Sequence, residues 1–343
     1  MKAAVFKEKG RLAVEEMPTP EPEPGEVLCR VKYCGICGTD LHNYSFGIPA
    51  PGSILGHEWC GVVTKLGEGV EDFSVGERVM LYKHPGVSPI PSGKRVDPRN
   101  IRLNPRAIYS ALSRRGAYAE YITAPTTGLI SIPNEISDQA AACLEPLVAA
   151  IHAVRLGNPK VSDTIAFIGA GPIALFMIQR VRQTGARAIF VSEISPTRAA
   201  KAAELGADRV FNPLKEDFIS EMVKLTGGRG PDIVYECAAG KNTLNQACQL
   251  VAQNGRVTCL AVYQEPIILE PLDWYMMQPE IKFTTMRDST PSDWQIATEA
   301  LCQRSIDVET VITDIIPLAD IQKVFQALLK PATNNMLRVL VAL

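Results

Sequence analysis

Hydrophobic and polar residues alternate over short runs through the first 150 or so residues of the chain. Examples are "EVLCRVKYCG", "VGERVML" and "GAYAEYITAP", and glycine- and proline-containing segments separate them. A period of two residues is typical of β-strands that bury one face, and Gly and Pro are the usual turn residues. We therefore expect this part of the chain to form a set of short strands.

The period changes after about residue 150. "DTIAFIGAGPIALFMIQRVRQTGARAIFVSE" indicates a strand, a Gly turn, a helix and a second strand, and "GPDIVYECAAGKNTLNQACQLVAQNGRVTCLAVY" repeats the alternation. This pattern predicts an α/β fold, a Rossmann-type doubly wound parallel sheet with helices on both faces. Beyond about residue 288 the chain indicates a helix, a short strand, another helix and the closing strand "MLRVLVAL".

The first Gly turn of this α/β region has the features of a dinucleotide site. Gly169 and Gly171 would let the backbone turn sharply and approach a pyrophosphate, and Ala174 takes the packing position of the motif. Pro172 and Ile173 open the following helix, whose free N–H groups would face the phosphates. The alternative is a purely structural glycine turn.

The end of the second strand carries the acid that such a site needs. Glu193 lies 24 residues after Gly169, near the spacing at which a carboxylate binds the adenosine ribose. A carboxylate there repels a 2′-phosphate, so we expect NAD rather than NADP. Arg198 follows closely, and it would either flank the adenosine or be a solvated helix residue.

Composition excludes several classes of protein. The chain has 343 residues, enough for two domains, and its net charge of −2 argues against nucleic acid as a partner. No apolar run approaches the roughly 18 residues of a membrane span. The nine cysteines come without a recognisable export signal, so we expect reduced thiols and a cytoplasmic location.

A C-x-x-C pair, Cys34 and Cys37, is the first candidate for chemistry. It would be a redox dithiol, half of a structural zinc site, or a pair in which one cysteine acts alone. His57 and Glu58 follow in "GHE", and Glu145 follows in "LEPL". One thiolate, one imidazole and one or two carboxylates would make a catalytic metal site with an open position.

These motifs, taken in order, carry a resemblance. "CGICGTDLH", "GHE", "GERV", "LEPL", "GAGPIAL" and "RAAKAAELGAD" match zinc-dependent medium-chain alcohol/polyol dehydrogenases over essentially the whole chain. Glu145 points to the sorbitol dehydrogenase-like branch, because classical alcohol dehydrogenases carry a cysteine there. The resemblance implies a GroES-like catalytic domain of residues 1–150 and 288–343, and an NAD-binding Rossmann domain of residues 151–287.

The resemblance also implies a role for each metal-site residue. Cys37 and His57 would be zinc ligands, and Glu58 a ligand or near-ligand. Glu145 would bind the zinc directly or through its water, while Cys34 would take no part. The alternatives are a core histidine at position 57 and a helix-capping acid at position 145.

A proton path is implied in the same way. Thr39 takes the position of the hydroxyl that relays the substrate proton, and His42 takes the end of that relay. Asp40 matches the carboxylate that orients the ligand histidine. His42 would otherwise be a surface histidine. Cys60, Cys143 and His152 are interpreted as packing residues.

The chain departs from its relatives in the segment after "GERV". Relatives often bind a structural zinc there through four cysteines, but residues 81–115 contain none, so we expect one zinc per subunit. This segment carries eight cations against Asp97, which favours either an oligomer-facing or solvated lobe, or a grip on an anionic substrate. The cations are Lys83, Lys94, Arg95, Arg99, Arg102, Arg106, Arg114 and Arg115.

The expected rim of the substrate pocket also differs from that of a sorbitol dehydrogenase. Arg287 keeps the arginine that approaches substrate and nicotinamide in polyol dehydrogenases, but Asp288 replaces the tyrosine that follows it. Asn43 likewise stands where those enzymes often place a tyrosine, so sorbitol itself is a doubtful substrate.

We therefore expect a homodimeric or homotetrameric zinc enzyme that oxidises a secondary alcohol of a polyol, or of a charged sugar-like molecule, with NAD. The edge strand in "EIKFTTMRD" is a candidate for subunit pairing. The alternatives are a zinc-free reductase of the same fold, an NAD-retaining epimerase or lyase, and a non-catalytic nucleotide-binding protein.

Overall fold

The computed structural model describes residues 1–82, 116–263, 266–284, 289–330 and 334–343. The chain divides into two compact units. The first unit contains residues 1–145 and 312–343, and the second contains residues 146–311. Each unit is described separately below.

The first unit is mostly β-structure. Two strands, β1 (Lys2–Glu8) and β2 (Arg11–Glu16), form an antiparallel pair. A larger sheet has the order β14-β15-β3-β4-β5-β7, and β6 also pairs with β3. Its strands are β3 (Glu26–Gly35), β4 (Glu58–Leu66), β5 (Arg78–Leu81), β6 (Tyr121–Pro125), β7 (Leu129–Ser131), β14 (Ile312–Pro317) and β15 (Arg338–Ala342). The helices are α1 (Gly38–Phe46), η1 (Thr126–Gly128), α4 (Asp138–Ala141), η4 (Leu318–Asp320) and α12 (Ile321–Leu328).

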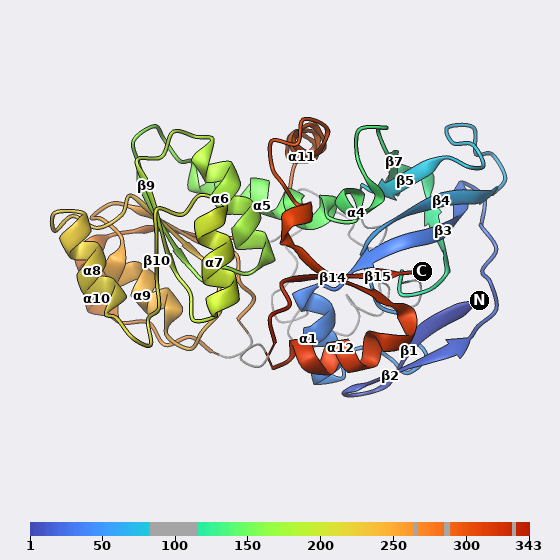
Figure 1. Cartoon of the computed structure of the whole chain (residues 1–343), viewed down its shortest axis with the longest axis horizontal. Coiled ribbons are helices and arrows are strands. Elements are labelled where there is room, and N and C mark those ends of the chain that lie inside the picture. The colour runs from blue at the N-terminus through green and yellow to red at the C-terminus, as the bar shows by residue number, and fades with distance from the viewer. Residues whose placement is uncertain (83–115, 264–265, 285–288, 331–333) are drawn as a thin grey trace. The chain divides into compact units, whose positions relative to one another are not determined.

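The closing strand completes this sheet. In Figure 1 the red strand β15 lies beside the blue strand β3, and the two pair antiparallel with Leu340 opposite Gly35. Val339 and Val341 are buried in the same core as Val31 and Cys34 of β3. The end of the chain is therefore built into the unit that contains its beginning.

The second unit is the predicted α/β domain. Six parallel strands have the order β10-β9-β8-β11-β12-β13. The order of the strands along the chain runs outward in one direction from β8 and in the other direction from β11, as in a Rossmann sheet. They are β8 (Thr164–Ile168), β9 (Ala188–Ser192), β10 (Arg209–Phe211), β11 (Ile233–Glu236), β12 (Arg256–Cys259) and β13 (Glu280–Phe283). The helices are α5 (Leu144–Gly157), α6 (Pro172–Arg182), α7 (Pro196–Glu204), α8 (Phe218–Leu225), α9 (Thr243–Leu250), α10 (Pro271–Met277), α11 (Pro291–Cys302) and η3 (Glu309–Val311).

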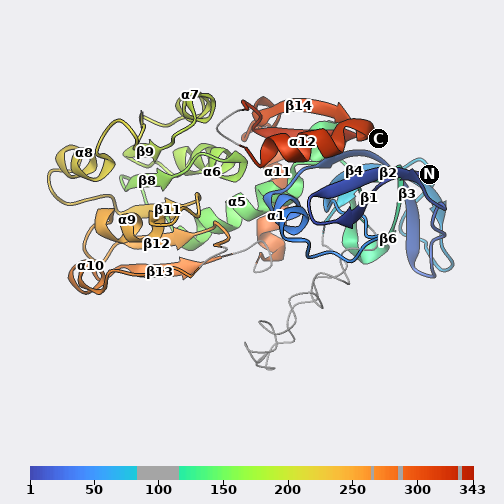
Figure 2. The same ribbon diagram turned by 90° about the horizontal axis from the view of Figure 1, so that it is seen from below.

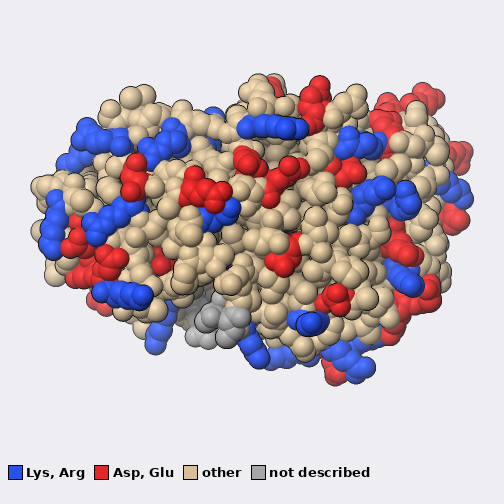
Figure 3. All heavy atoms as spheres, in the orientation of Figure 1, with Lys and Arg blue, Asp and Glu red and all other residues tan. Residues whose placement is uncertain are grey.

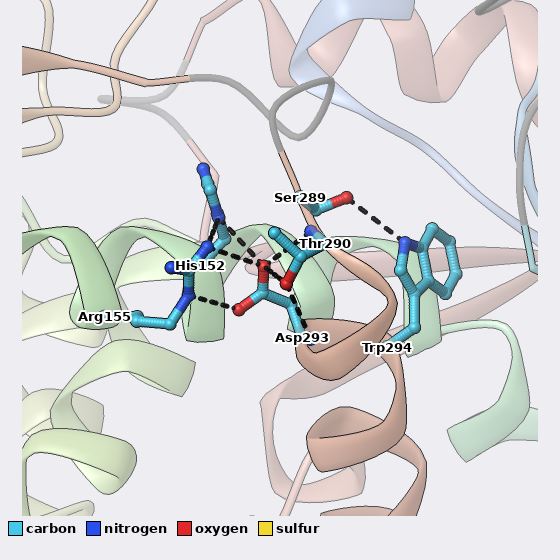
Figure 4. Close-up of polar contacts among 6 residues, drawn as sticks. All are labelled: His152, Arg155, Ser289, Thr290, Asp293 and Trp294. Atoms are coloured by element: carbon cyan, nitrogen blue, oxygen red, sulfur yellow. Dashed lines mark hydrogen bonds and ion pairs between the residues drawn. The ribbon is translucent and has the colours of Figure 1, made fainter. Parts of the chain in front are cut away.

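The boundaries of the units differ from the predicted domain boundaries. Residues 289–311, assigned above to the catalytic domain, belong with the α/β unit. The reason is a buried polar network that joins α11 to α5 (Figure 4). Asp293 accepts hydrogen bonds from Nε of Arg155 at 2.8 Å and lies 3.0 Å from Nδ1 of His152. Hydrogen bonds between Gln179 and Asp307 hold the following loop. His152 is thus a buried helix residue, as expected.

The face of the molecule drawn in Figure 3 shows no large patch of a single sign of charge over the described residues. On the face in Figure 3, Lys and Arg are interspersed with Asp and Glu over the described residues. No helix in the described ranges combines the length and the hydropathy needed to cross a bilayer.

Candidate metal centre and dinucleotide site

Cys37 lies where β3 has ended and α1 begins. It is the N-cap residue of α1, and its Sγ accepts a hydrogen bond from the Thr39 N–H at 3.4 Å. Asp40 closes a capping box, because its Oδ2 accepts from the Cys37 N–H at 3.3 Å. Burial, and then the charge of Glu58, raise the pKa of the Cys37 thiol, while the positive end of the helix dipole acts in the opposite direction.

His57 and Glu58 lie at the start of β4, opposite the end of β3. The donor atoms of Cys37, His57 and Glu58 all lie within 4.8 Å of one another. Within the described part of the chain this is the one group of three or more such donors. Cys34 does not join it. Its side chain is fully buried in the core, with Sγ 3.8 Å from the Gly35 carbonyl oxygen.

Asp40 contacts the imidazole ring of His57. Its Oδ1 lies 3.4 Å from Nδ1 of His57. A carboxylate on one ring nitrogen fixes the orientation of a histidine that binds metal through the other. Burial alone would raise the pKa of Asp40, but His57, Tyr118 and Cys37 outweigh it and lower that pKa. Burial alone would lower the pKa of His57, yet Asp40 and Cys37 raise it well above its ordinary value.

Glu58 is paired with a buried arginine. Its Oε2 lies 2.5 Å from Nη2 of Arg338 at the start of β15, and both side chains are at most 3% exposed. A Cβ at position 35 would lie 1.9 Å from the same Nη2, so a side chain there would displace the Glu58–Arg338 pair. Sequence reasoning missed Arg338. The available signal was a single arginine within the apolar closing strand "MLRVLVAL".

Glu145 lies beside this group without being one of its three mutually close donors. It stands in the first turn of α5 and is buried. Burial, and then the charge of Glu58, raise the pKa of Glu145, and a hydrogen bond with Glu58 adds to this effect. The structure therefore brings the two carboxyl groups together, with Glu58 nearer to Cys37 and His57.

The predicted relay residues lie on α1. Thr39 is half-buried in the first turn, with its N–H on Sγ of Cys37. His42 is also half-buried, its ring is 4.6 Å from that of Phe46, and burial lowers its pKa. Its Nδ1 is buried without a hydrogen-bond partner among the described residues, so His42 is not a fully solvated surface histidine.

The Gly turn of the second unit has the geometry that a dinucleotide needs. Gly169 follows β8 with φ of +93°, and a Cβ there would lie 3.0 Å from Cβ of Ala238. Gly171 caps α6, and a Cβ there would meet nothing within 4 Å, so the space in front of the helix is open. Pro172 is the first residue of α6, followed by the half-buried Ile173.

The acid after β9 is tied to this turn. Oε2 of Glu193 accepts from the Ala170 N–H at 2.7 Å, and Oε1 accepts from the Ser195 N–H at 2.8 Å. Each oxygen keeps a lone pair for a ribose hydroxyl. Arg198 is half-buried in the first turn of α7. Arg287, Asp288 and the charged residues of segment 83–115 lie outside the described residues.

Comparison with known proteins shows the family to which the chain belongs. Residues 23–134 match the profile of the alcohol dehydrogenase GroES-like domain, and residues 172–303 match that of the zinc-binding dehydrogenases. The (R,R)-butanediol dehydrogenase of Bacillus subtilis is 31% identical, and the match covers 96% of each chain. The chain belongs to the zinc-dependent medium-chain alcohol/polyol dehydrogenase family.

Other members show how broad the family is. A sorbitol dehydrogenase of Halalkalibacterium halodurans is 29% identical over 93% of each chain. The D-arabitol-phosphate dehydrogenase of Enterococcus avium is 28% identical over 93% of this chain and 91% of its own. As a member of this family, the chain is an oxidoreductase that acts on CH–OH groups.

Solved structures of similar fold are dehydrogenases as well. The 2R,3R-butanediol dehydrogenase of B. subtilis covers 100% of this chain and 99% of its own, with a TM-score of 0.84 and 28% identity. A chain from Sinorhizobium meliloti described as a zinc-binding dehydrogenase was solved with NADP, with a TM-score of 0.85, 28% identity and coverage of 100% and 99%. Family membership therefore brings a zinc ion and a nicotinamide cofactor.

The residues of this dehydrogenase fit both groups. Tetrahedral zinc with bonds of about 2.0–2.3 Å places its donors about 3.5 Å apart. A thiol, an imidazole and a carboxylate within 4.8 Å of one another are compatible with that spacing. The pKa values of Cys37 and His57 are both raised. A metal ion that binds them would therefore displace protons from the two side chains. For the dinucleotide, the open space at Gly171 suits a pyrophosphate.

The C-x-x-C pair allows a matched test of the metal site. We expect Cys37→Ser to lose zinc, because a serine hydroxyl replaces the thiolate donor. Cys34→Ser should keep about one zinc per chain, since Cys34 points into the core. Metal analysis after dialysis measures both variants. Equal loss of zinc in the two variants would make Cys34 a ligand as well.

Proposed function

We propose that this protein is an NAD-dependent zinc dehydrogenase that converts a secondary alcohol of a polyol, or of a charged sugar-like molecule, to a ketone by hydride transfer. The observation that carries the proposal is the close set of Cys37, His57 and Glu58, held by Asp40. Three protein donors leave a coordination position for substrate, as in catalytic rather than structural zinc sites. The Gly169–Pro172 turn and Glu193 supply the NAD site.

The oxidation removes a hydride and a proton from the alcohol. Bound zinc would supply a Lewis acid that lowers the pKa of the substrate hydroxyl, and bound NAD would accept the hydride. Cys37, His57 and Glu58 would hold the metal, with Glu145 as a second carboxylate beside it. Thr39 would take the hydroxyl proton, and His42 would pass it to solvent, leaving a ketone, NADH and one proton.

The substrate class follows from chemistry that the named relatives share. Butanediol, sorbitol and arabitol phosphate each carry a secondary hydroxyl next to another oxygen, and one of the three is an anion. The eight cations of segment 83–115 favour an anionic member of this class. These eight residues lie outside the described part of the chain.

Matched substrate pairs test the proposed activity. Each pair is a neutral polyol and its phosphorylated or carboxylated counterpart, and the initial rate of NAD reduction is measured at several salt concentrations. We expect the anionic member to be preferred at least tenfold in kcat/KM, about 1.4 kcal/mol, and salt to reduce the preference.

The same assay contains its controls. Cys37→Ser should lose turnover with both members of each pair while NADH binding persists, because the cofactor residues lie in the other unit. A zinc-free reductase would retain activity in this variant. An epimerase or lyase would convert substrate without net NADH. Preference for the neutral member would reject the anionic substrate class but leave the dehydrogenase.

The choice of cofactor depends on Glu193. We expect the wild-type protein to prefer NAD, and Glu193→Gln to raise kcat/KM for NADP relative to NAD by about tenfold, since a charge near the 2′-phosphate is removed. Glu204→Gln is the matched control, because it removes an exposed charge from the far end of α7. If Glu193→Gln changes the ratio no more than Glu204→Gln, Glu193 does not select the cofactor.

We further propose that the subunits pair through β13. Figure 2 shows β13 at the margin of its sheet, where β12 is its one strand neighbour among the described residues. Large apolar side chains are exposed on and beside it, among them Ile268, Leu272, Tyr275, Met276 and Phe283. An unpaired edge with exposed apolar side chains favours pairing with a second copy across a two-fold axis.

Charges placed on this surface test the pairing. We expect Tyr275→Asp combined with Phe283→Asp to halve the molar mass in solution, because two like charges then meet their copies. Leu214→Asp changes an equally exposed leucine elsewhere in the unit and should leave the mass unchanged. Light scattering during gel filtration measures all three proteins. An unchanged mass in the double variant would contradict pairing through β13.

A further inference from the structure

Asp40 connects both segments that supply the metal donors. Its Oδ2 accepts from the Cys37 N–H at 3.3 Å, and its Oδ1 accepts from the Gly56 N–H at 3.4 Å. Cys37 is itself a donor residue, and Gly56 directly precedes His57. The carboxylate is 2% exposed, so water cannot hold it in place. These backbone hydrogen bonds are long and weak, and they alone leave the carboxylate plane loosely defined.

One short hydrogen bond sets that plane. The hydroxyl of Tyr118 lies 2.7 Å from Oδ2 of Asp40 and 3.0 Å from the carbonyl oxygen of Gly35. A phenol has one proton to donate, and an ionised carboxylate accepts it more strongly than a carbonyl. The hydrogen bond from Tyr118 is therefore the shortest one to Asp40 among the described contacts.

The position of the Tyr118 hydroxyl is itself fixed by packing. The backbone N–H of Tyr118 donates to Leu55 at 3.0 Å, and its carbonyl accepts from Ala4 at 2.8 Å. Its ring is fully buried, and it meets the ring of Phe325 edge-on with centroids 5.8 Å apart. A Cβ at Gly56 would lie 3.0 Å from the Tyr118 ring, so the tyrosine also packs against the turn that precedes His57.

We propose that Tyr118 is a positioning residue of the zinc centre, whose hydroxyl fixes the Asp40 carboxylate that orients His57. Tyr118 touches neither metal nor substrate, and it acts through Asp40. This inference rests on the metal site of the proposed function. Residues that orient a ligand histidine typically contribute 10–100-fold to metal affinity. For Tyr118, one step further from the metal, we expect about tenfold.

Tyr118→Phe tests the role, and Tyr44→Phe is its matched control. Tyr44 is also buried, and its ring packs edge-on against the same Phe325, with centroids 5.2 Å apart. Its hydroxyl donates to the Gly10 carbonyl and accepts from Gln322, away from Asp40. Each substitution removes one buried hydroxyl with its hydrogen bonds, so the two should cost similar stability without metal.

The dissociation constant for zinc, measured by chelator competition on the full chain, is the first readout. We expect Tyr118→Phe to raise it about tenfold and Tyr44→Phe to leave it within about twofold of wild type. The second readout is the absorption spectrum of the cobalt-substituted protein, which should change in Tyr118→Phe alone because the imidazole ligand is no longer held. Thermal unfolding of the metal-free variants controls for a general loss of structure.

A double variant that combines Tyr118→Phe with Asp40→Asn supplies an independent test. If Tyr118 acts through Asp40, adding Tyr118→Phe to Asp40→Asn should weaken zinc binding by much less than tenfold. Equal zinc affinities in Tyr118→Phe and Tyr44→Phe, or full additivity in the double variant, would overturn the inference. A wild-type chain that binds no zinc would instead overturn the proposed function.

Discussion

The metal centre depends on one buried carboxylate, that of Asp40. The two segments that carry Cys37 and His57 are separate loops, one at the start of α1 and one before β4. Asp40 accepts a hydrogen bond from each loop and faces the imidazole ring of His57. A buried carboxylate is unfavourable unless its lone pairs are used, so it constrains every group around it. The Cys37 N–H of the capping box, the Gly56 N–H and the Tyr118 hydroxyl each donate a hydrogen bond to Asp40.

The balance of charge around this carboxylate explains why a divalent cation suits the site. Asp40, Glu58, Glu145 and a thiolate at Cys37 would bring several negative charges together, while Arg338 supplies one positive charge. Without metal, all three groups favour their protonated forms. Burial, and then the charge of Glu58, raise the pKa values of Cys37 and Glu145, while the charges of Asp40 and Cys37 outweigh burial and raise the pKa of His57. Zinc would replace those protons, and metal binding and deprotonation are therefore linked. Glycine at position 35 leaves room for the Glu58–Arg338 pair, which occupies the space of a side chain.

The sequence could predict what short spacings encode. The period of two in residues 1–150, the strand–helix alternation after it and the Gly169 turn gave the fold class, and the motif "GHE" placed His57 and Glu58 together. The sequence could not show contacts between distant segments. Arg338 reaches Glu58 from the last strand, and Tyr118 reaches Asp40 across 78 residues. Periodicity identified α11 as a helix, but it could not show that Asp293 bonds to α5, so the domain boundary was set too early.

The measurement that tests this account most directly is anomalous X-ray scattering at the zinc absorption edge from crystals of the protein as purified. The account predicts a metal peak within bonding distance of Sγ of Cys37 and Nε2 of His57, about 2.3 and 2.1 Å respectively. Nδ1 of His57 should remain on Asp40, and Cys34 should make no contact with the metal. The absence of a peak at this site, or a peak bonded to Cys34, would contradict the account.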